Sequence, residues 1–199
     1  YAAFGTEKLY DLDRDSSGNI YLIGEASTGG LSYGSPYDSS HNGGADVFLV
    51  KMSSAGALLY VSYYGGTGND IGNSVQVAAD GTLYVGGYSY STSGIDSAGA
   101  YDTTGDATNG NGFLAHFDTD LSGSAQLLFG TYFGTSGASA VSELSLDSYG
   151  RPVVVGTTSG TIPTTVDAHD ATLSGSSGPA RWRIEDGGRR ACFERASID

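Results

Sequence analysis

The sequence has few of the residues that build disulfide frameworks, zinc sites or nucleic-acid-binding surfaces. Its 199 residues include one Cys, one Met, one Trp and four Pro, and only 9 basic residues stand against 22 acidic ones. A single Cys excludes an internal disulfide framework and a Cys-based zinc site. The net charge of −13 argues against a nucleic-acid partner, because such partners are bound largely through Lys and Arg.

Long apolar runs and the common nucleotide motifs are also missing. No run of about 18 apolar residues occurs, so no membrane span is predicted. No charged-then-apolar leader precedes Tyr1, so we expect a signal peptide to have been removed or left out. No P-loop or dinucleotide fingerprint occurs, so no nucleotide cofactor is predicted. The string Gly30-Leu31-Ser32-Tyr33-Gly34 matches the G-x-S-x-G motif, but no helix is predicted after it, so we discount it.

An internal repeat organises most of the chain. Three polar turns end in Gly and run into an apolar segment, at Gly18, Gly81 and Gly150, which are 63 and 69 positions apart. A second segment recurs in step, at 46–52 and 112–117, and a third follows it at 58–65 and 127–134. A long period with strand-like contents predicts a repeat architecture.

The repeated segments are predicted to be β-strands. Each apolar run has five to eight residues, is rich in Val, Ile, Tyr and Phe, and is bounded by turn residues. Both alternating sets of positions are apolar, which predicts a sheet covered on both faces. We therefore predict an all-β fold of β-propeller blades, each with four antiparallel strands. In the second unit the strands are expected near 71–79 and at 82–90, 111–118 and 125–133.

The repeat motifs resemble those of the bacterial SBBP-type β-propeller family. The motifs are Ala45-Asp46-Val47-Phe48-Leu49-Val50-Lys51, then Tyr63-Tyr64-Gly65-Gly66-Thr67-Gly68-Asn69-Asp70, then Gly81-Thr82-Leu83-Tyr84-Val85-Gly86-Gly87. The resemblance covers about residues 1–180, and Pro152 and His116 depart from the family pattern. It implies a secreted or cell-surface bacterial propeller with a mainly structural or adhesive role.

The predicted units cover 1–66, 67–134 and 135–180, and residues 181–199 form an atypical tail. Five of the nine basic residues, with Trp182 and Cys192, lie in this tail. We interpret it as a closing strand or as foreign sequence. About three blades per chain are too few for a closed ring of four to eight. We therefore expect a homodimer that closes a six-bladed ring, in which tail strands around 182–185 pair with the partner's first strands. A fragment of a longer array is the alternative.

One turn has the spacing of a calcium-binding loop. Oxygen-bearing side chains occupy its positions 1, 3 and 5, Gly18 follows at position 6, and Asp11 lies just before it; the three are Asp13, Asp15 and Ser17. Hard cations such as Ca²⁺ require several oxygens around a tight turn. The acid expected at position 12 is missing, since Gly24 stands there. The turn is therefore a candidate site for Ca²⁺ or another divalent cation, or else an ordinary hairpin turn.

The long loops carry a second repeated feature, an aromatic or His residue followed by Asp. The pairs are Tyr37-Asp38, Tyr101-Asp102 and His169-Asp170. If these loops lie on one rim of a propeller, their acids form a ring that attracts cations; its members would be Asp38, Asp70, Asp102, Asp167 and Asp170. His169 is suited to metal ligation or general-base chemistry. The alternative is that each aromatic ring packs on its blade and each Asp caps a turn. Of the other histidines, His41 lies in a Gly-rich loop and His116 is expected to be structural.

Two classes of function follow from these features. The first is a non-catalytic module whose Tyr-rich loops bind a glycan or a protein, since Tyr offers a large rigid surface with a polar tip. The second is a metal-assisted hydrolase of esters or phosphoesters, with His169 and Asp170 as the catalytic residues. The resemblance to the SBBP-type family favours the module, and the hydrolase is the alternative.

Overall fold

The part of the chain that the structure describes forms three antiparallel sheets of four strands each. The computed structural model describes residues 7–134, 137–159, 178–185 and 190–194. The first sheet contains β1 (Lys8–Arg14), β2 (Ile20–Ala26), β3 (Asp46–Met52) and β4 (Leu58–Tyr64). The second contains β5 (Asp70–Val77), β6 (Leu83–Ser89), β7 (Asn111–Phe117) and β8 (Leu127–Phe133), with the short 3-10 helix η1 (Gly123–Gln126) before β8. The third contains β9 (Ser139–Leu146), β10 (Pro152–Thr158), β11 (Gly178–Glu185) and β12 (Arg190–Glu194).

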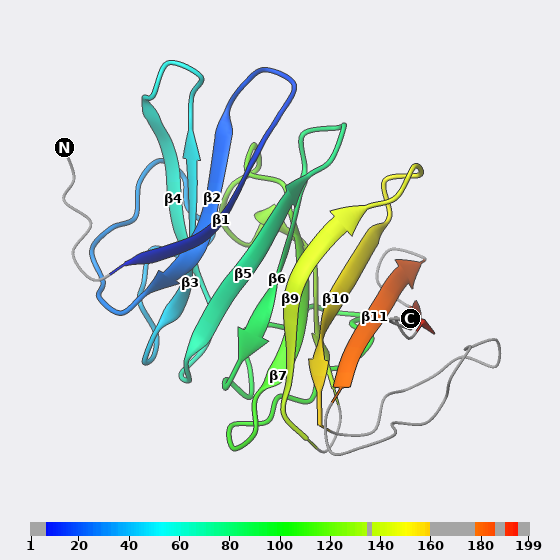
Figure 1. The fold of residues 1–199 in the computed structure, drawn as a ribbon. Coiled ribbons are helices and arrows are strands. Elements are labelled where there is room, and N and C mark those ends of the chain that lie inside the picture. Colours follow the sequence, from blue (N-terminus) through cyan, green and yellow to red (C-terminus); the bar gives the residue numbers. More distant parts are fainter. Residues whose placement is uncertain (1–6, 135–136, 160–177, 186–189, 195–199) are drawn as a thin grey trace.

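The prediction of an all-β fold is confirmed. The four strands of the second sheet lie within two residues of their predicted ranges. The described part of the chain has no α-helix, and no helix there is long and apolar enough to cross a membrane. Figure 1 shows the three sheets standing side by side, with β1, β5 and β9 as neighbours. Within the described residues the sheets form an open stack and not a closed ring.

The expected pairing of the tail with a partner chain is wrong. Strand β11 covers residues 178–185, and its two edges are occupied by β10 and β12 of the same chain. The tail therefore completes the third sheet. The sequence pattern did not show this, because β11 and β12 have no counterpart in the repeated motifs.

Apolar side chains fill the space between successive sheets. The largest cluster joins the first sheet to the second and contains fully buried Tyr21, Ile23, Phe113 and Tyr132. A second cluster joins the second sheet to the third through residues such as Leu114 and Leu144. Each sheet thus buries a surface that it could not bury alone, which is the logic of stacked repeats.

Two glycines allow the sheets to approach closely. A Cβ atom on Gly72 of β5 would lie 2.5 Å from Cγ1 of Ile23 in the first sheet. A Cβ atom on Gly86 of β6 would lie 2.6 Å from Cγ1 of Val141 in the third sheet. The densely packed contact surfaces between the sheets therefore leave no room for a side chain larger than that of Gly at these two positions.

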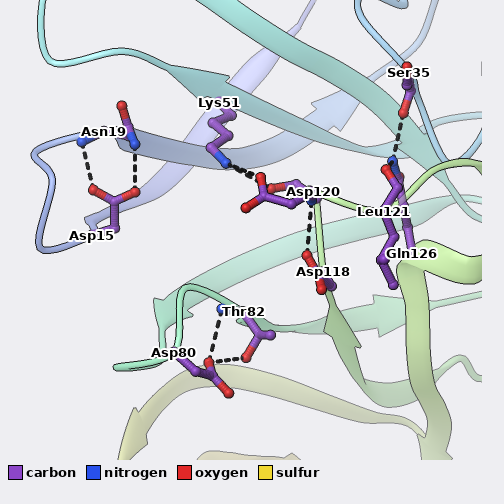
Figure 2. A network of polar contacts seen from close by, with 11 residues as sticks. Asp15, Asn19, Ser35, Lys51, Asp80, Thr82, Asp118, Asp120, Leu121 and Gln126 are labelled. Carbon is purple, nitrogen blue, oxygen red and sulfur yellow. Dashed lines mark hydrogen bonds and ion pairs between the residues drawn. The ribbon is translucent and has the colours of Figure 1, made fainter.

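Polar side chains also join neighbouring sheets. Asp11 Oδ2 accepts hydrogen bonds from the backbone N–H of Val75 and from Ser74 Oγ, both at 2.9 Å. Asp13 Oδ2 accepts one from the backbone N–H of Val77 at 2.8 Å. These bonds tie the first strand of one sheet to the first strand of the next. Figure 2 shows a further tie, the 2.9 Å ion pair of Lys51 with Asp120.

Candidate functional site

A pocket of about 440 Å³ opens beside the loop between β6 and β7. It lies where this loop meets Gly134, at the end of β8. We call it the Asp102 pocket, and its lining residues are Asp102, Thr104, Gly105, Asp106, Ala107 and Gly134. It contains one of the acids that the sequence analysis proposed for binding, and its volume lies in the range of small-molecule sites.

The loop is held on β8 through the backbone of Asp102. The N–H of Asp102 donates to Thr131 Oγ1 at 2.9 Å, and its carbonyl accepts the N–H of Tyr132 at 3.1 Å. Asp102 Oδ1 then accepts the N–H of Thr104 at 2.8 Å, which is the self-closing turn that Asp favours. The position of this carboxylate is therefore set by a regular strand.

Asp106 also lines the pocket and is likewise fixed by backbone hydrogen bonds. Its Oδ1 accepts the backbone N–H groups of Thr108 and Asn109 at 2.8 and 3.0 Å, and its own N–H donates to Asn111 Oδ1 at 2.6 Å. The hydrogen bonds from Asn109 and Thr108 hold the pKa of Asp106 below its usual value. Asp106 is thus ionised at neutral pH and presents an acceptor that needs little reorganisation to bind a donor.

No side chain can be added at the base of this loop without a clash. A Cβ atom on Gly105 would lie 2.2 Å from the carbonyl oxygen of Ser91 and 3.0 Å from the ring of Tyr132. The backbone at Gly105 therefore rests directly on the sheet below it. Gly105 itself lines the Asp102 pocket and stands between Asp102 and Asp106 in the sequence.

The first sheet repeats the docking of the loop. The N–H of Asp38 donates to Ser62 Oγ at 3.1 Å, its carbonyl accepts the N–H of Tyr63 at 3.1 Å, and its Oδ1 accepts the N–H of Ser40 at 2.7 Å. These bonds match those of Asp102 one for one. The predicted equivalence of the two aromatic–Asp pairs is thus visible in their hydrogen bonds.

The aromatic partners of these acids are turned away from the loop surface. Tyr37 makes edge contacts with Tyr64 and Phe117, with ring centroids 5.9 and 5.5 Å apart, in the cluster between the first and second sheets. Tyr101 packs on Phe133 at 6.4 Å beside the cluster between the second and third sheets. Both rings therefore contribute to the packing of sheets.

Asp70 is buried at the start of β5. Its carboxylate accepts hydrogen bonds from Ser89 Oγ, from Ser91 Oγ at 2.7 Å and from the N–H of Gly66 at 2.8 Å. These bonds fold the Gly-rich turn before β5. The structure does not place Asp70 among the residues that line the Asp102 pocket.

The residues predicted to bind calcium have other hydrogen-bond partners in the structure. Asp11 and Asp13 lie in β1, and each holds the neighbouring strand β5. Asp15 accepts the N–H groups of Ser17 and Asn19, both at 2.9 Å, and closes the turn. Figure 2 shows the Asn19 contacts of this carboxylate. Among the described residues no group of three or more His, Cys, Asp or Glu side chains is arranged to hold a metal ion. The calcium site stays a prediction.

The three histidines differ in what the structure shows of them. His169 lies outside the described residues, together with Asp167 and Asp170. His116 stacks on the ring of Tyr84 at 4.1 Å and its Nε2 lies 2.8 Å from Thr82 Oγ1, and burial lowers its pKa. These contacts agree with the structural role expected for His116. The ring of His41 packs edge-on against Tyr63 at 6.0 Å.

Two residues of interest were missed by the sequence analysis. Thr104 and Asp106 line the pocket, yet they lie outside the repeated aromatic–Asp pair. The spacing Asp106-x-x-Asn109 could have signalled a closed turn, but nothing in the sequence places that turn beside the end of β8.

Comparison with models of known protein families and with curated protein sequences finds no match to this chain.

Proposed function

We propose that the protein is a non-catalytic β-propeller module, secreted or on a bacterial cell surface, that binds a hydroxyl-rich ligand such as a glycan. The Asp102 pocket is the binding site in this proposal. The observation that carries it is the pair of aspartates that line the pocket, each fixed by backbone hydrogen bonds. The repeat motifs are the basis for proposing the SBBP type, and sheets of four antiparallel strands stacked side by side are what propeller blades require.

The chemistry of the pocket favours a neutral, hydroxylated ligand. Carboxylate oxygens accept hydrogen bonds from sugar hydroxyls, and the hydroxyl of Thr104 can both donate and accept. A net charge of −13 disfavours anionic ligands, since like charges repel at long range. The carboxylates and the hydroxyl of the lining therefore fit hydrogen bonding to a neutral, hydroxylated ligand.

The test is a glycan array with the intact chain, followed by calorimetry on any glycan that binds. Ala107 is exposed and lines the pocket, so Ala107→Phe fills the pocket without removing a loop hydrogen bond. We expect Ala107→Phe to weaken binding at least about tenfold, a loss typical of a blocked contact surface. Ala107→Ser leaves the space open and is the matched control.

Two results would contradict the proposal. One is the absence of any glycan binding below millimolar concentration. The other is equal binding by Ala107→Phe and Ala107→Ser, which would move the ligand away from the Asp102 pocket. Parallel titrations with Ca²⁺ and with a chelator show whether a cation takes part.

A further inference from the structure

The first strand of each sheet has one apolar residue that faces the preceding sheet. The β-pairing register aligns Leu12 of β1, Val75 of β5 and Leu144 of β9, each opposite the fourth residue after its turn glycine. Val75 and Leu144 are 0% and 2% exposed because they pack against the sheet before them. Leu12 is 62% exposed. The same repeat position is thus buried in the second and third sheets and exposed in the first. We call the exposed surface around Leu12 the Leu12 face.

The Leu12 face continues along β1. Leu9 pairs with Gly24 as Leu12 pairs with Leu22, so it shares the face of Leu12, and it is also about half exposed. Arg14 is exposed two residues beyond Leu12. Residues two apart in a strand lie on one face, so Leu12 and Arg14 share it. Asp11 and Asp13 lie on the other face, bonded to β5. The face combines apolar surface with a positive charge.

The outer face of the third sheet has the residues that would complement the exposed face of β1. The residue aligned with Asp11 and Ser74 is Glu143 of β9, and it is exposed. In the two internal contacts this position supplies the oxygen that accepts an N–H of the following sheet, from Val75 or from Leu144. Val155, opposite Glu143 on β10, is 39% exposed.

We infer that the Leu12 face binds the outer face of β9 and β10 of a second copy of this chain, head to tail. Leu12 would then be covered as Val75 is, and Glu143 of one copy would lie near Arg14 of the other. Two such contacts close a ring of six sheets, within the usual range for propellers, and head-to-tail contacts form rings when the rotation closes. The inference rests on the proposed propeller, but it does not depend on any ligand.

Light scattering coupled to size exclusion tests the contact with the intact chain. We expect wild-type protein at micromolar concentration to have twice the 20.3 kDa mass of the chain. Leu12→Glu places a charge in the contact, and we expect it to weaken the dimer at least about tenfold. Leu128→Glu is the matched control, since Leu128 is 44% exposed but lies on the middle sheet. A monomeric wild type, or a Leu12→Glu variant as dimeric as wild type, overturns the inference.

A charge exchange separates the assigned contact from a general loss of stability. Arg14→Glu alone places two acids together and should weaken the dimer. Adding Glu143→Arg to the same chain restores opposite charges in both contacts of the ring, and the dimer should recover. Circular dichroism verifies that all variants stay folded. Failure of the double variant to recover would also overturn the inference, whereas glycan binding is measured separately on the Asp102 pocket.

Discussion

Asp11 Oδ2 accepts the backbone N–H of Val75 at 2.9 Å across the boundary between the first two sheets. The same oxygen accepts Ser74 Oγ, so one carboxylate satisfies two groups on the edge of β5. Unsatisfied polar groups at such a boundary would be costly, because burial removes the water that could replace the bond. The acidic composition of the chain is thus used in part to join its repeats.

Asp11→Ala should lower the free energy of unfolding by about 1–3 kcal/mol, since it leaves a backbone N–H and a hydroxyl without their acceptor. Urea unfolding followed by fluorescence measures this. Asp120→Ala is the control, because the Asp120 side chain is 84% exposed and its ion pair with Lys51 should contribute less than about 1 kcal/mol. Equal losses in the two variants would contradict the assigned role of Asp11.

Asp46 occupies a position that the second sheet fills with an amide. Asp46 Oδ2 accepts the N–H of Asn42 at 2.7 Å, as Asn111 Oδ1 accepts the N–H of Asp106 at 2.6 Å. Asp46 is fully buried, and its Oδ1 has no hydrogen-bond partner among the residues that the structure describes. Burial raises its pKa, with Asp70 and Asp38 adding to the rise, while Asn42 and His41 act in the opposite direction.

Asp46→Asn should therefore stabilise the protein at neutral pH, by roughly 1 kcal/mol for an unpaired buried group. A raised folded-state pKa means that the wild type is favoured below the unfolded-state pKa and loses this stability as the pH rises through the folded-state pKa. The advantage of Asp46→Asn should hence grow from pH 4 to pH 7 in urea titrations. The reverse exchange, Asn111→Asp, should destabilise at pH 7. An Asp46→Asn variant that is less stable than wild type at pH 7 would refute this account.

Gly72→Ala tests how tightly the first two sheets are packed. The added methyl group would lie 2.5 Å from Ile23 and 3.0 Å from Val47, so it must displace side chains in the largest apolar cluster. Overpacking of this kind costs about 1–3 kcal/mol, and thermal unfolding should show it. Gly29→Ala is the control, because Gly29 is exposed and the nearest atom to an added methyl group is His41 Cβ at 3.3 Å, so the neighbour must move by only a few tenths of an ångström. Equal melting temperatures for the two variants would mean that the sheets can shift apart freely.

The sequence predicted the strands well where their residues repeat. The segments after Gly18, Gly81 and Gly150 are all strands, because apolar runs bounded by turn residues leave few alternatives. Asp11 and Asp13 lie in β1, the counterpart of the strand predicted near 71–79, and were instead interpreted as cation ligands. Their spacing suggested a cation loop, whereas their partners in β5 lie 63 and 64 positions along the chain. Only the packing of sheets brings those partners together.

The candidate site could be predicted only in part. Asp102 was identified from its repeat, and the structure finds it beside a pocket. Tyr37 and Tyr101 were proposed for binding in the same way, but their rings pack between sheets. Repetition in a sequence shows that a position matters to every unit, which is more often a matter of packing than of a single ligand. Residues that occur once, such as Asp106, must be found from the three-dimensional arrangement.

The hydrolase hypothesis has a direct test in His169 and Asp170. We expect the protein to be inert toward a panel of carboxylic and phosphoric esters, with and without a chelator, because the proposed function needs no metal-activated water. If ester hydrolysis is found, His169→Ala should reduce it by at least about a hundredfold, as for loss of a general base. His41→Ala, which changes a histidine outside the proposed catalytic pair, is the matched control. Ester hydrolysis that depends on both His169 and a metal removed by the chelator would contradict the proposed binding function and favour the hydrolase hypothesis.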